Sequence, residues 1–159
     1  MILKSIASLI QSYMDLPVGV VFLRNEKINQ TKMEDFNITV GFMNLKPIGT
    51  SVKYLSATDQ EEIATNMSAN VVVEIYGRDF AVITRKEEIV QALCSSASKE
   101  AQTSGAFLIA QIPSSFNDIS GLDGAAIPYR FQMHFAVQFI SKKIKSIDYY
   151  DKFSKEVIT

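Results

Sequence analysis

Apolar and polar residues alternate without a break along residues 129–140, near the end of the chain. Large apolar side chains occupy every second position: Tyr129, Phe131, Met133, Phe135, Val137 and Phe139. The positions between them are mostly polar and carry little charge: Arg130, Gln132, His134, Ala136 and Gln138. Because successive side chains of a strand point to opposite faces of its sheet, this pattern predicts a long strand with an aromatic face against a core.

Two helices are predicted before this strand. Apolar residues recur at three- and four-residue spacing over residues 2–15, which predicts an amphipathic helix that ends before Pro17. A similar stripe over residues 79–98 predicts a long second helix with Asp79 as its amino-terminal cap. Cys94 belongs to this stripe, so we expect it to be a buried and unreactive thiol.

Several shorter strands complete the predicted sheet. Residues rich in β-branched or aromatic side chains predict strands at 18–23, 36–42 and 71–76. Residues 106–112 are apolar on both faces, which is typical of a covered interior strand, although the same periodicity also fits a helix. Pro47 is expected to interrupt the strand that begins at Phe36, and residues 52–55 then form its continuation or a hairpin partner.

Polar segments separate these elements. They predict an exposed loop at residues 24–35, a connector at residues 58–68 and a structured loop at residues 113–128. The order of elements predicts an α+β fold, in which a mostly antiparallel β-sheet of four to five strands carries two main helices on one face. Residues 1–159 are predicted to form a single domain, with a carboxyl-terminal tail over residues 142–159.

The composition narrows the functional classes. Apolar residues make up 47% of the chain and the formal net charge is −1, so no broad electrostatic attraction to nucleic acid or membranes is implied. One cysteine and one histidine exclude an internal disulfide and leave no set of soft ligands for structural zinc. The start of the chain lacks a cleavage site, and no uncharged run reaches the ~20 residues of a membrane span, so we expect a soluble protein.

Candidate catalytic residues are few. His134 is the only imidazole, so a serine or cysteine nucleophile has just one possible histidine base. We expect His134 to be structural or solvent-facing and the protein not to be an enzyme, while an enzyme that pairs His134 with a distant acid stays an open alternative. Gly121 and Gly124 have no Lys-Ser/Thr pair nearby and predict a plain turn instead of a phosphate clamp.

Two groups of basic residues are candidate interaction sites. The first polar loop contains Arg24, Lys27 and Lys32, but three acidic neighbours dilute their charge, which favours an ordinary surface loop. A more concentrated basic group lies at the end of the last strand: Lys142, Lys143 and Lys145. An alternative function is therefore a nucleic-acid-binding α+β module that uses the sheet and residues 142–145.

The order of motifs over residues 36–153 resembles the tail terminator, or neck, proteins of long-tailed bacteriophages. Three stretches carry the likeness: Val71-Val-Val-Glu-Ile-Tyr-Gly-Arg-Asp79; Ile112-Pro113 followed by Asp118-Ile-Ser-Gly-Leu-Asp-Gly124 and Tyr129-Arg-Phe-Gln-Met-His-Phe135; and Ile147-Asp-Tyr-Tyr-Asp151. Proteins of this family are similar in having a strand that enters a helix through a Gly or Pro turn, and an arginine that opens the last long strand, here Arg130.

This resemblance implies a structural virion protein of the tail or neck, made in the host cytoplasm, with no cofactor and no enzymatic activity. Subunits of the family form a ring, commonly a hexamer, at the head-proximal end of the tail, where they stop tube growth and join tail to head. The implied partners are further copies of the chain, the tail tube protein and the head-completion or connector proteins. DNA passes through the lumen, and no membrane contact is implied.

Contacts of such a ring are expected at sheet edges and loops. Unpaired strand edges are satisfied repeatedly when identical subunits close into a ring, and the loops at residues 24–35 and 113–128 are placed at subunit or tube contacts. The candidate interaction residues are Arg24, Lys27, Lys32, Phe116, Asp118, Asp123, Arg130, Lys142 and Lys143. Alanine replacements of Phe116, Asp118 and Asp123 are expected to weaken assembly while leaving the monomer folded.

Overall fold

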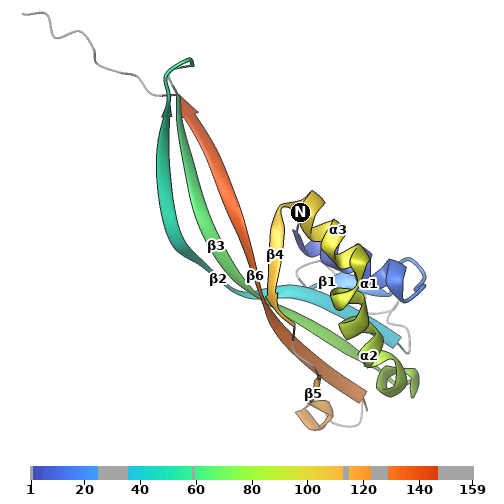
Figure 1. Ribbon diagram of the computed structural model, residues 1–159. Helices are drawn as coiled ribbons and strands as arrows, with labels where there is room; N and C mark the ends of the chain where they lie inside the picture. Colours follow the sequence, from blue (N-terminus) through green and yellow to red (C-terminus); the bar gives the residue numbers. More distant parts are fainter. Residues whose placement is uncertain (1, 25–35, 59, 113–114, 123–128, 147–159) are drawn as a thin grey trace, which may run out of the picture.

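The computed structural model describes residues 2–24, 36–58, 60–112, 115–122 and 129–146 (Figure 1). Three α-helices are α1 (Ile2–Tyr13), α2 (Ala81–Cys94) and α3 (Ser96–Gly105). Six strands are β1 (Val21–Leu23), β2 (Phe36–Leu55), β3 (Gln60–Gly77), β4 (Phe107–Gln111), β5 (Asn117–Asp118) and β6 (Tyr129–Ser146), and a 3-10 helix, η2, spans Ser120–Leu122. None of the helices among these residues is long and apolar enough to cross a membrane.

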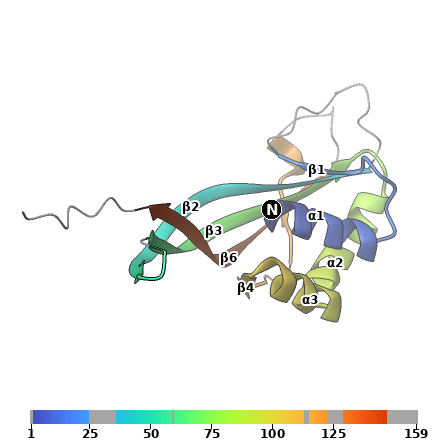
Figure 2. The ribbon, with the colours of Figure 1, turned by 90° about the horizontal axis from the view of Figure 1, so that it is seen from above.

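The strands form one mixed sheet in the order β1-β2-β3-β6-β4, and the short β5 also pairs with β6. All pairings are antiparallel except that of β1 with β2. The helices gather on one face of this sheet, as the view from above shows (Figure 2). The predicted α+β class, with a mostly antiparallel sheet covered by helices on one face, is confirmed.

The core lies between the helices and the body of the sheet. The alternation that predicted the last strand is confirmed, because Phe131, Met133, Phe135 and Val137 are all buried. Their neighbours on β3 and β2 are β-branched: Val71, Val73, Ile75, Ile38 and Val40. Helix α1 contributes Ile6 and Ile10 to this cluster, so the predicted amphipathic helix packs on the sheet through its apolar stripe.

The strands β2, β3 and β6 are much longer than their sequence patterns indicated. Pro47 does not interrupt β2, because register shifts at Phe42/Asn44 and Pro47/Gly49 take up the irregularity and the pairing with β3 continues to Leu55. The prediction that residues 58–68 form a connector is wrong, because the residues from Gln60 onward belong to β3. The tail predicted from Lys142 is also corrected, because β6 continues to Ser146.

The predicted long second helix is divided in two. The N-cap position of α2 is occupied by Phe80 and not by Asp79 as predicted, but the carboxylate of Asp79 still accepts a hydrogen bond from the backbone N–H of Ala81 at 2.9 Å. Ser95 ends α2 in extended conformation, and its hydroxyl accepts from the N–H of Ser98 at 3.2 Å, which starts α3. Cys94, predicted to be buried, is exposed at this break.

Strand β4 is an edge strand, which corrects the prediction of a covered interior strand. It pairs with β6 alone among the described strands, and its burial alternates so that Phe107 and Ile109 face the core and Leu108 is exposed. Ala106 precedes it in left-handed conformation at the end of α3. The apolar run is therefore explained by one buried face and one exposed leucine.

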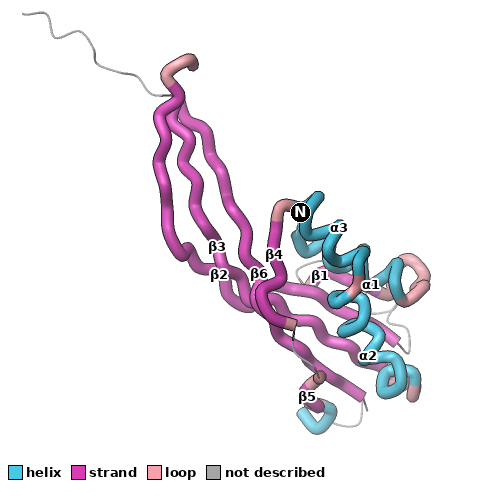
Figure 3. Tube along the Cα trace, in the orientation of Figure 1, coloured by secondary structure: helices cyan, strands magenta, loops and turns pink. Residues whose placement is uncertain are grey.

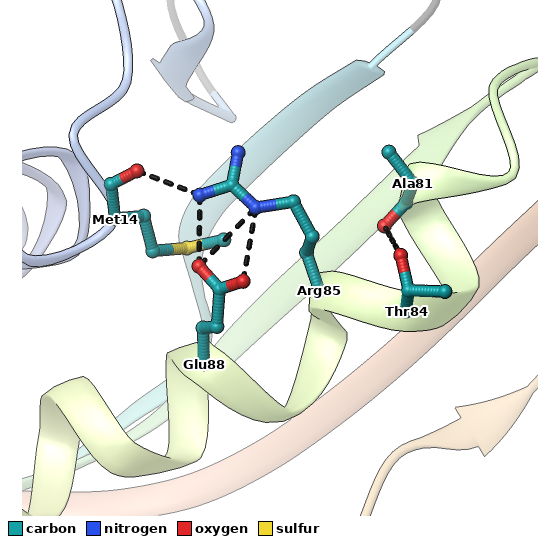
Figure 4. A network of polar contacts seen from close by, with 5 residues as sticks. All are labelled: Met14, Ala81, Thr84, Arg85 and Glu88. Atoms are coloured by element: carbon teal, nitrogen blue, oxygen red, sulfur yellow. Dashed lines mark hydrogen bonds and ion pairs between the residues drawn. The ribbon is translucent and has the colours of Figure 1, made fainter.

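Helices α1 and α2 are joined by a charged side chain. The Nη2 of Arg85 donates to the backbone carbonyl of Met14 at 2.7 Å and to Glu88 at 2.8 Å (Figure 4). The same guanidinium lies 5.6 Å from the ring centroid of Phe36 on β2. The hydrogen bond with Glu88 raises the pKa of Arg85, so the group stays charged at this junction of α1, α2 and β2.

Candidate assembly interface

A three-stranded arm extends away from the helical body (Figures 1 and 3). We call "the arm" residues 47–55, 60–67 and 139–146, which begin at the row of neighbours Pro47, Met67 and Phe139. Beyond this row the strands are paired with one another, but no described helix covers either face. Five large apolar residues of the arm are strongly exposed: Ile48, Val52, Tyr54, Ile140 and Ile144.

The strand register assigns the arm's residues to two faces. Directly opposed residues of an antiparallel pair share a face. Met67 and Phe139 continue the helix-covered face, which also carries Val52, Ile63 and Lys143 in one row. The opposite face carries Ile140 and Ile144, each 56% exposed. Exposed apolar residues on both faces of a projecting sheet are typical of a surface that contacts another protein.

The lysines of the arm are divided between its faces. The Nζ of Lys142 donates to Glu62 at 3.3 Å on the face of Ile140. Lys143 and Lys145 point to the other face, where their opposed residues on β3 are Ile63 and Glu61. The three lysines therefore do not form one basic row, which weighs against the nucleic-acid-binding hypothesis.

A groove of about 660 Å³ lies where the arm leaves the body. The end of α3 and the start of β4 line one side of it with Gln102, Thr103 and Phe107. Phe139 and Ile140 of β6 line the other side. The groove is thus continuous with the first residues of the arm's β6 edge.

A buried carboxylate organises the opposite face of the sheet within the body. Glu74 of β3 is 5% exposed, and it lies 3.1 Å from Arg130 and 3.7 Å from Arg24. The Nε2 of Gln132 donates to the same carboxylate at 2.8 Å. Gly41 makes room for Arg24, because a Cβ at this glycine would lie 2.6 Å from the Cβ of Arg24. Glu74 therefore brings together two of the predicted interaction residues.

Tyr76 belongs to the same cluster. Burial raises the pKa of its phenol above the ordinary value of 10.0, and the carboxylate of Glu74 raises it further, while Arg130 acts in the opposite direction. Tyr76 lies directly opposite Arg130 on β6. The cluster therefore combines the ion pairs of Glu74 with a neutral phenol at Tyr76.

The loop before β6 does not present all its predicted contact residues to solvent. Phe116 is partly buried and packs against the hydrophobic core, so its alanine replacement is expected to cost some stability as well as any assembly contact. Asp118 is exposed and its Oδ1 accepts from the hydroxyl and the N–H of Ser120, which lowers the pKa of the carboxyl. Asp118 thus shapes the turn that leads into η2.

The structure separates the predicted interaction residues into three places. Arg24 and Arg130 meet at Glu74, Lys142 and Lys143 lie on the arm, and Phe116 and Asp118 lie at the short strand β5 before β6. Three further predicted residues lie outside the described part of the chain: Lys27, Lys32 and Asp123. Glu74 and Glu62 were missed, because the partner of each lies on β6, 56 or 80 residues away in the sequence.

His134 lies half-buried on the sheet face opposite the helices. It lines a shallow hollow of about 310 Å³ with Asn70, Gln111 and Ala136, and no acidic side chain is among the described residues that line this hollow. Across the described ranges no three His, Cys, Asp or Glu residues converge as metal ligands do.

The fold is similar to that of a solved structure described as the sheath/tube terminator, in its extended state, of an extracellular contractile injection system, PVC. The similarity has a TM-score of 0.59 at 12% sequence identity and covers 91% of this chain and 56% of that chain. The chain therefore spans a little over half the length of that terminator. No family model and no curated protein matches the sequence.

Proposed function

We propose that this chain is a tail terminator: a structural subunit that forms a ring at the end of a tube and stops the tube from growing. The observation that carries the proposal is the similarity of nearly the whole fold to the terminator of a sheath and tube assembly. The resemblance of the motif order to the terminator proteins of long-tailed phages supports the same assignment independently of the structure.

The arm supplies a physical basis for assembly. Its apolar residues are exposed on both faces, and along most of the arm no described strand pairs with the outer edges of β2 and β6. A contact between different surfaces of identical subunits generates a ring when the rotation closes, and a closed ring offers no free copy of that contact. A tube capped by such a ring cannot add another layer.

The finer features of the proposal follow from the phage resemblance. The ring is a hexamer at the head-proximal end of a tail, its subunits contact the tail tube protein on one side and head-completion or connector proteins on the other, and DNA passes through its lumen. The subunit acts without catalytic turnover and without a cofactor. In this role the chain is a component of an assembled particle and has no membrane contact.

The test uses the purified full chain with and without tail tubes of the same particle. Light scattering measures the mass in solution, and negative-stain microscopy detects rings and the ends of tubes. The proposal expects discs of uniform size or tubes with a disc on one end only. A protein that stays monomeric at all concentrations and leaves both tube ends bare contradicts it. Tight, salt-dependent binding of oligonucleotides by the monomer supports the nucleic-acid-binding alternative in its place.

A further inference from the structure

The two edges of the arm differ in their capacity to accept another strand. The β2 edge contains Pro47, which has no backbone N–H, and the two register shifts of this strand bend its ladder. The β6 edge contains neither proline nor glycine, and its pairing with β3 runs without a register shift from Tyr129 to Ser146. Natural sheets protect an edge by the devices found on β2, so the β6 edge is the one suited to strand addition.

The open part of the β6 edge has the length of an ordinary strand. Strand β3 pairs with one edge of β6 along the whole length of β6. The other edge of β6 therefore pairs with β5 at residues 131–132 and with β4 at residues 136–139. From Ile140 to Ser146 no described strand pairs with this second edge. These seven residues span roughly 23 Å at about 3.3 Å per residue.

The side chains along this open edge alternate in chemistry. Ile140 and Ile144 are exposed on one face, where the lysine between them, Lys142, is already paired with Glu62. Lys143 and Lys145 are exposed on the other face. A strand added beside β6 would place its side chains next to these on the same faces, so apolar residues fit one face and carboxylates fit the other.

The net charge of the arm favours the same partner. The arm contains four lysines and two glutamates, a net charge of +2, although the whole chain has a net charge of −1. An acidic strand is therefore attracted to the arm, whereas a second basic edge, such as that of β2 with its Lys53, is repelled. Charge complementarity therefore favours an acidic segment of another protein over the β2 edge of a second copy of this chain.

We propose that residues 140–146 bind, as an added strand, an extended segment of a partner protein in which carboxylate and apolar side chains alternate. The groove at the base of the arm receives one end of this segment, because Ile140 lies both in the groove and at the start of the open edge. The inference rests on the proposed function, since the partner is then another component of the tail or neck. It identifies that component by chemistry: an exposed acidic and amphipathic strand.

The test measures binding of synthetic peptides to the full chain by fluorescence anisotropy. The probe is a fluorescein-labelled peptide of about seven residues in which glutamate and valine alternate, matching the length of a common strand. A lysine-valine peptide of the same pattern is expected to bind at least about tenfold more weakly. Methylation of every backbone nitrogen of the probe removes the hydrogen-bond donors of both its edges and is expected to abolish binding.

Charge reversal identifies the edge that binds. The double variant Lys143→Glu/Lys145→Glu is expected to bind the lysine-valine peptide better than the glutamate-valine peptide, which reverses the preference of the unaltered chain. The matched control Lys53→Glu changes the β2 edge; it lowers the net charge of the arm, so it should weaken the preference slightly without reversing it. Lys143→Gln/Lys145→Gln, which introduces no new charge, should lose the preference without reversing it; circular dichroism checks that all variants are folded.

Several outcomes overturn the inference. A preference for the glutamate-valine peptide that survives the double reversal, or that is lost equally with Lys53→Glu, assigns the binding to another surface. A DNA duplex that displaces the probe and binds more tightly assigns the lysines to nucleic acid. The same preparations are examined for rings and capped tubes: rings without any peptide preference refute this inference alone, whereas the peptide preference without rings or caps refutes the terminator function alone.

Discussion

Arg130 lies 3.1 Å from Glu74 across the two central strands of the sheet, and the glutamate is almost completely buried. Arg24 reaches the same carboxylate from the end of β1, with 3.7 Å between the charged atoms. The two arginines that the sequence offered as interaction residues therefore share one structural partner. Both keep part of their side chains exposed, so the cluster stabilises the monomer and still borders its surface.

Removing the charge of Glu74 is expected to destabilise the monomer. Glu74→Gln removes the buried negative charge that Arg130 and Arg24 contact, and we expect a loss of about 1–3 kcal/mol in the free energy of unfolding, measured with urea. The matched control is Glu62→Gln, which removes the partner of the exposed Lys142 and should cost about 1 kcal/mol or less. Equal effects of the two replacements would contradict the structural role assigned to Glu74.

Arg85 is expected to hold α1 against α2 through the shape of its planar guanidinium group as well as through its charge. Arg85→Ala removes the hydrogen bonds to Met14 and Glu88, and we expect a loss of about 1–2 kcal/mol in the free energy of unfolding. Arg85→Lys should restore less than half of this loss, because an ammonium group cannot present the planar fork of a guanidinium. Gln91→Ala changes an exposed position of the same helix and serves as the control, with an effect within about 0.5 kcal/mol.

Tyr76 is expected to make stability depend on alkaline pH. Its pKa is raised in the folded state, so the neutral phenol contributes stability that is fully present below the unfolded pKa of about 10 and is lost as the pH rises through the higher folded pKa. The free energy of unfolding of the unaltered chain should therefore fall more steeply above about pH 10 than that of Tyr76→Phe. Parallel pH profiles for the two proteins would show that Tyr76 does not titrate with folding.

The exposed apolar residues of the arm are expected to serve assembly and not monomer stability. Ile48→Ser/Val52→Ser should change the free energy of unfolding by less than about 1 kcal/mol, because the two residues are 61% and 59% exposed. The same variant should shift the light-scattering mass from rings toward monomers. Val18→Ser, at a position of the body that is 94% exposed, is the matched control and should leave ring formation unchanged.

The sequence predicted the elements that have one buried face. Phe131, Met133, Phe135 and Val137 alternate in the sequence because β6 has the core on one side there, and Ile6 and Ile10 recur with helical spacing for the same reason. The strand from Gln60 escaped prediction because neither of its faces is buried on the arm, so no apolar period marks it. Its strand conformation is fixed by pairing with β2 and β6, which are distant in the sequence.

Polar interactions that leave no periodic pattern in the sequence limited the other predictions. The break between α2 and α3 depends on a hydroxyl that caps a new helix, and a serine within a helical pattern has several other uses. The Glu74 cluster depends on the register between β3 and β6, which places Gln132 opposite Glu74 and Arg130 opposite Tyr76. Such a register cannot be read from the sequence of either strand alone. The sequence therefore predicted Arg24 and Arg130 as interaction residues but did not predict their common partner, Glu74.

The length distribution of tail tubes tests the central claim most directly. Tubes of the tail tube protein from the same particle are allowed to grow in the presence of increasing amounts of this chain, and their lengths are measured by negative-stain microscopy. A terminator is expected to arrest growth, so tubes should shorten as the chain is added and carry a disc at one end. Tubes that grow to the same lengths with both ends bare, at any amount of the chain, would contradict the account.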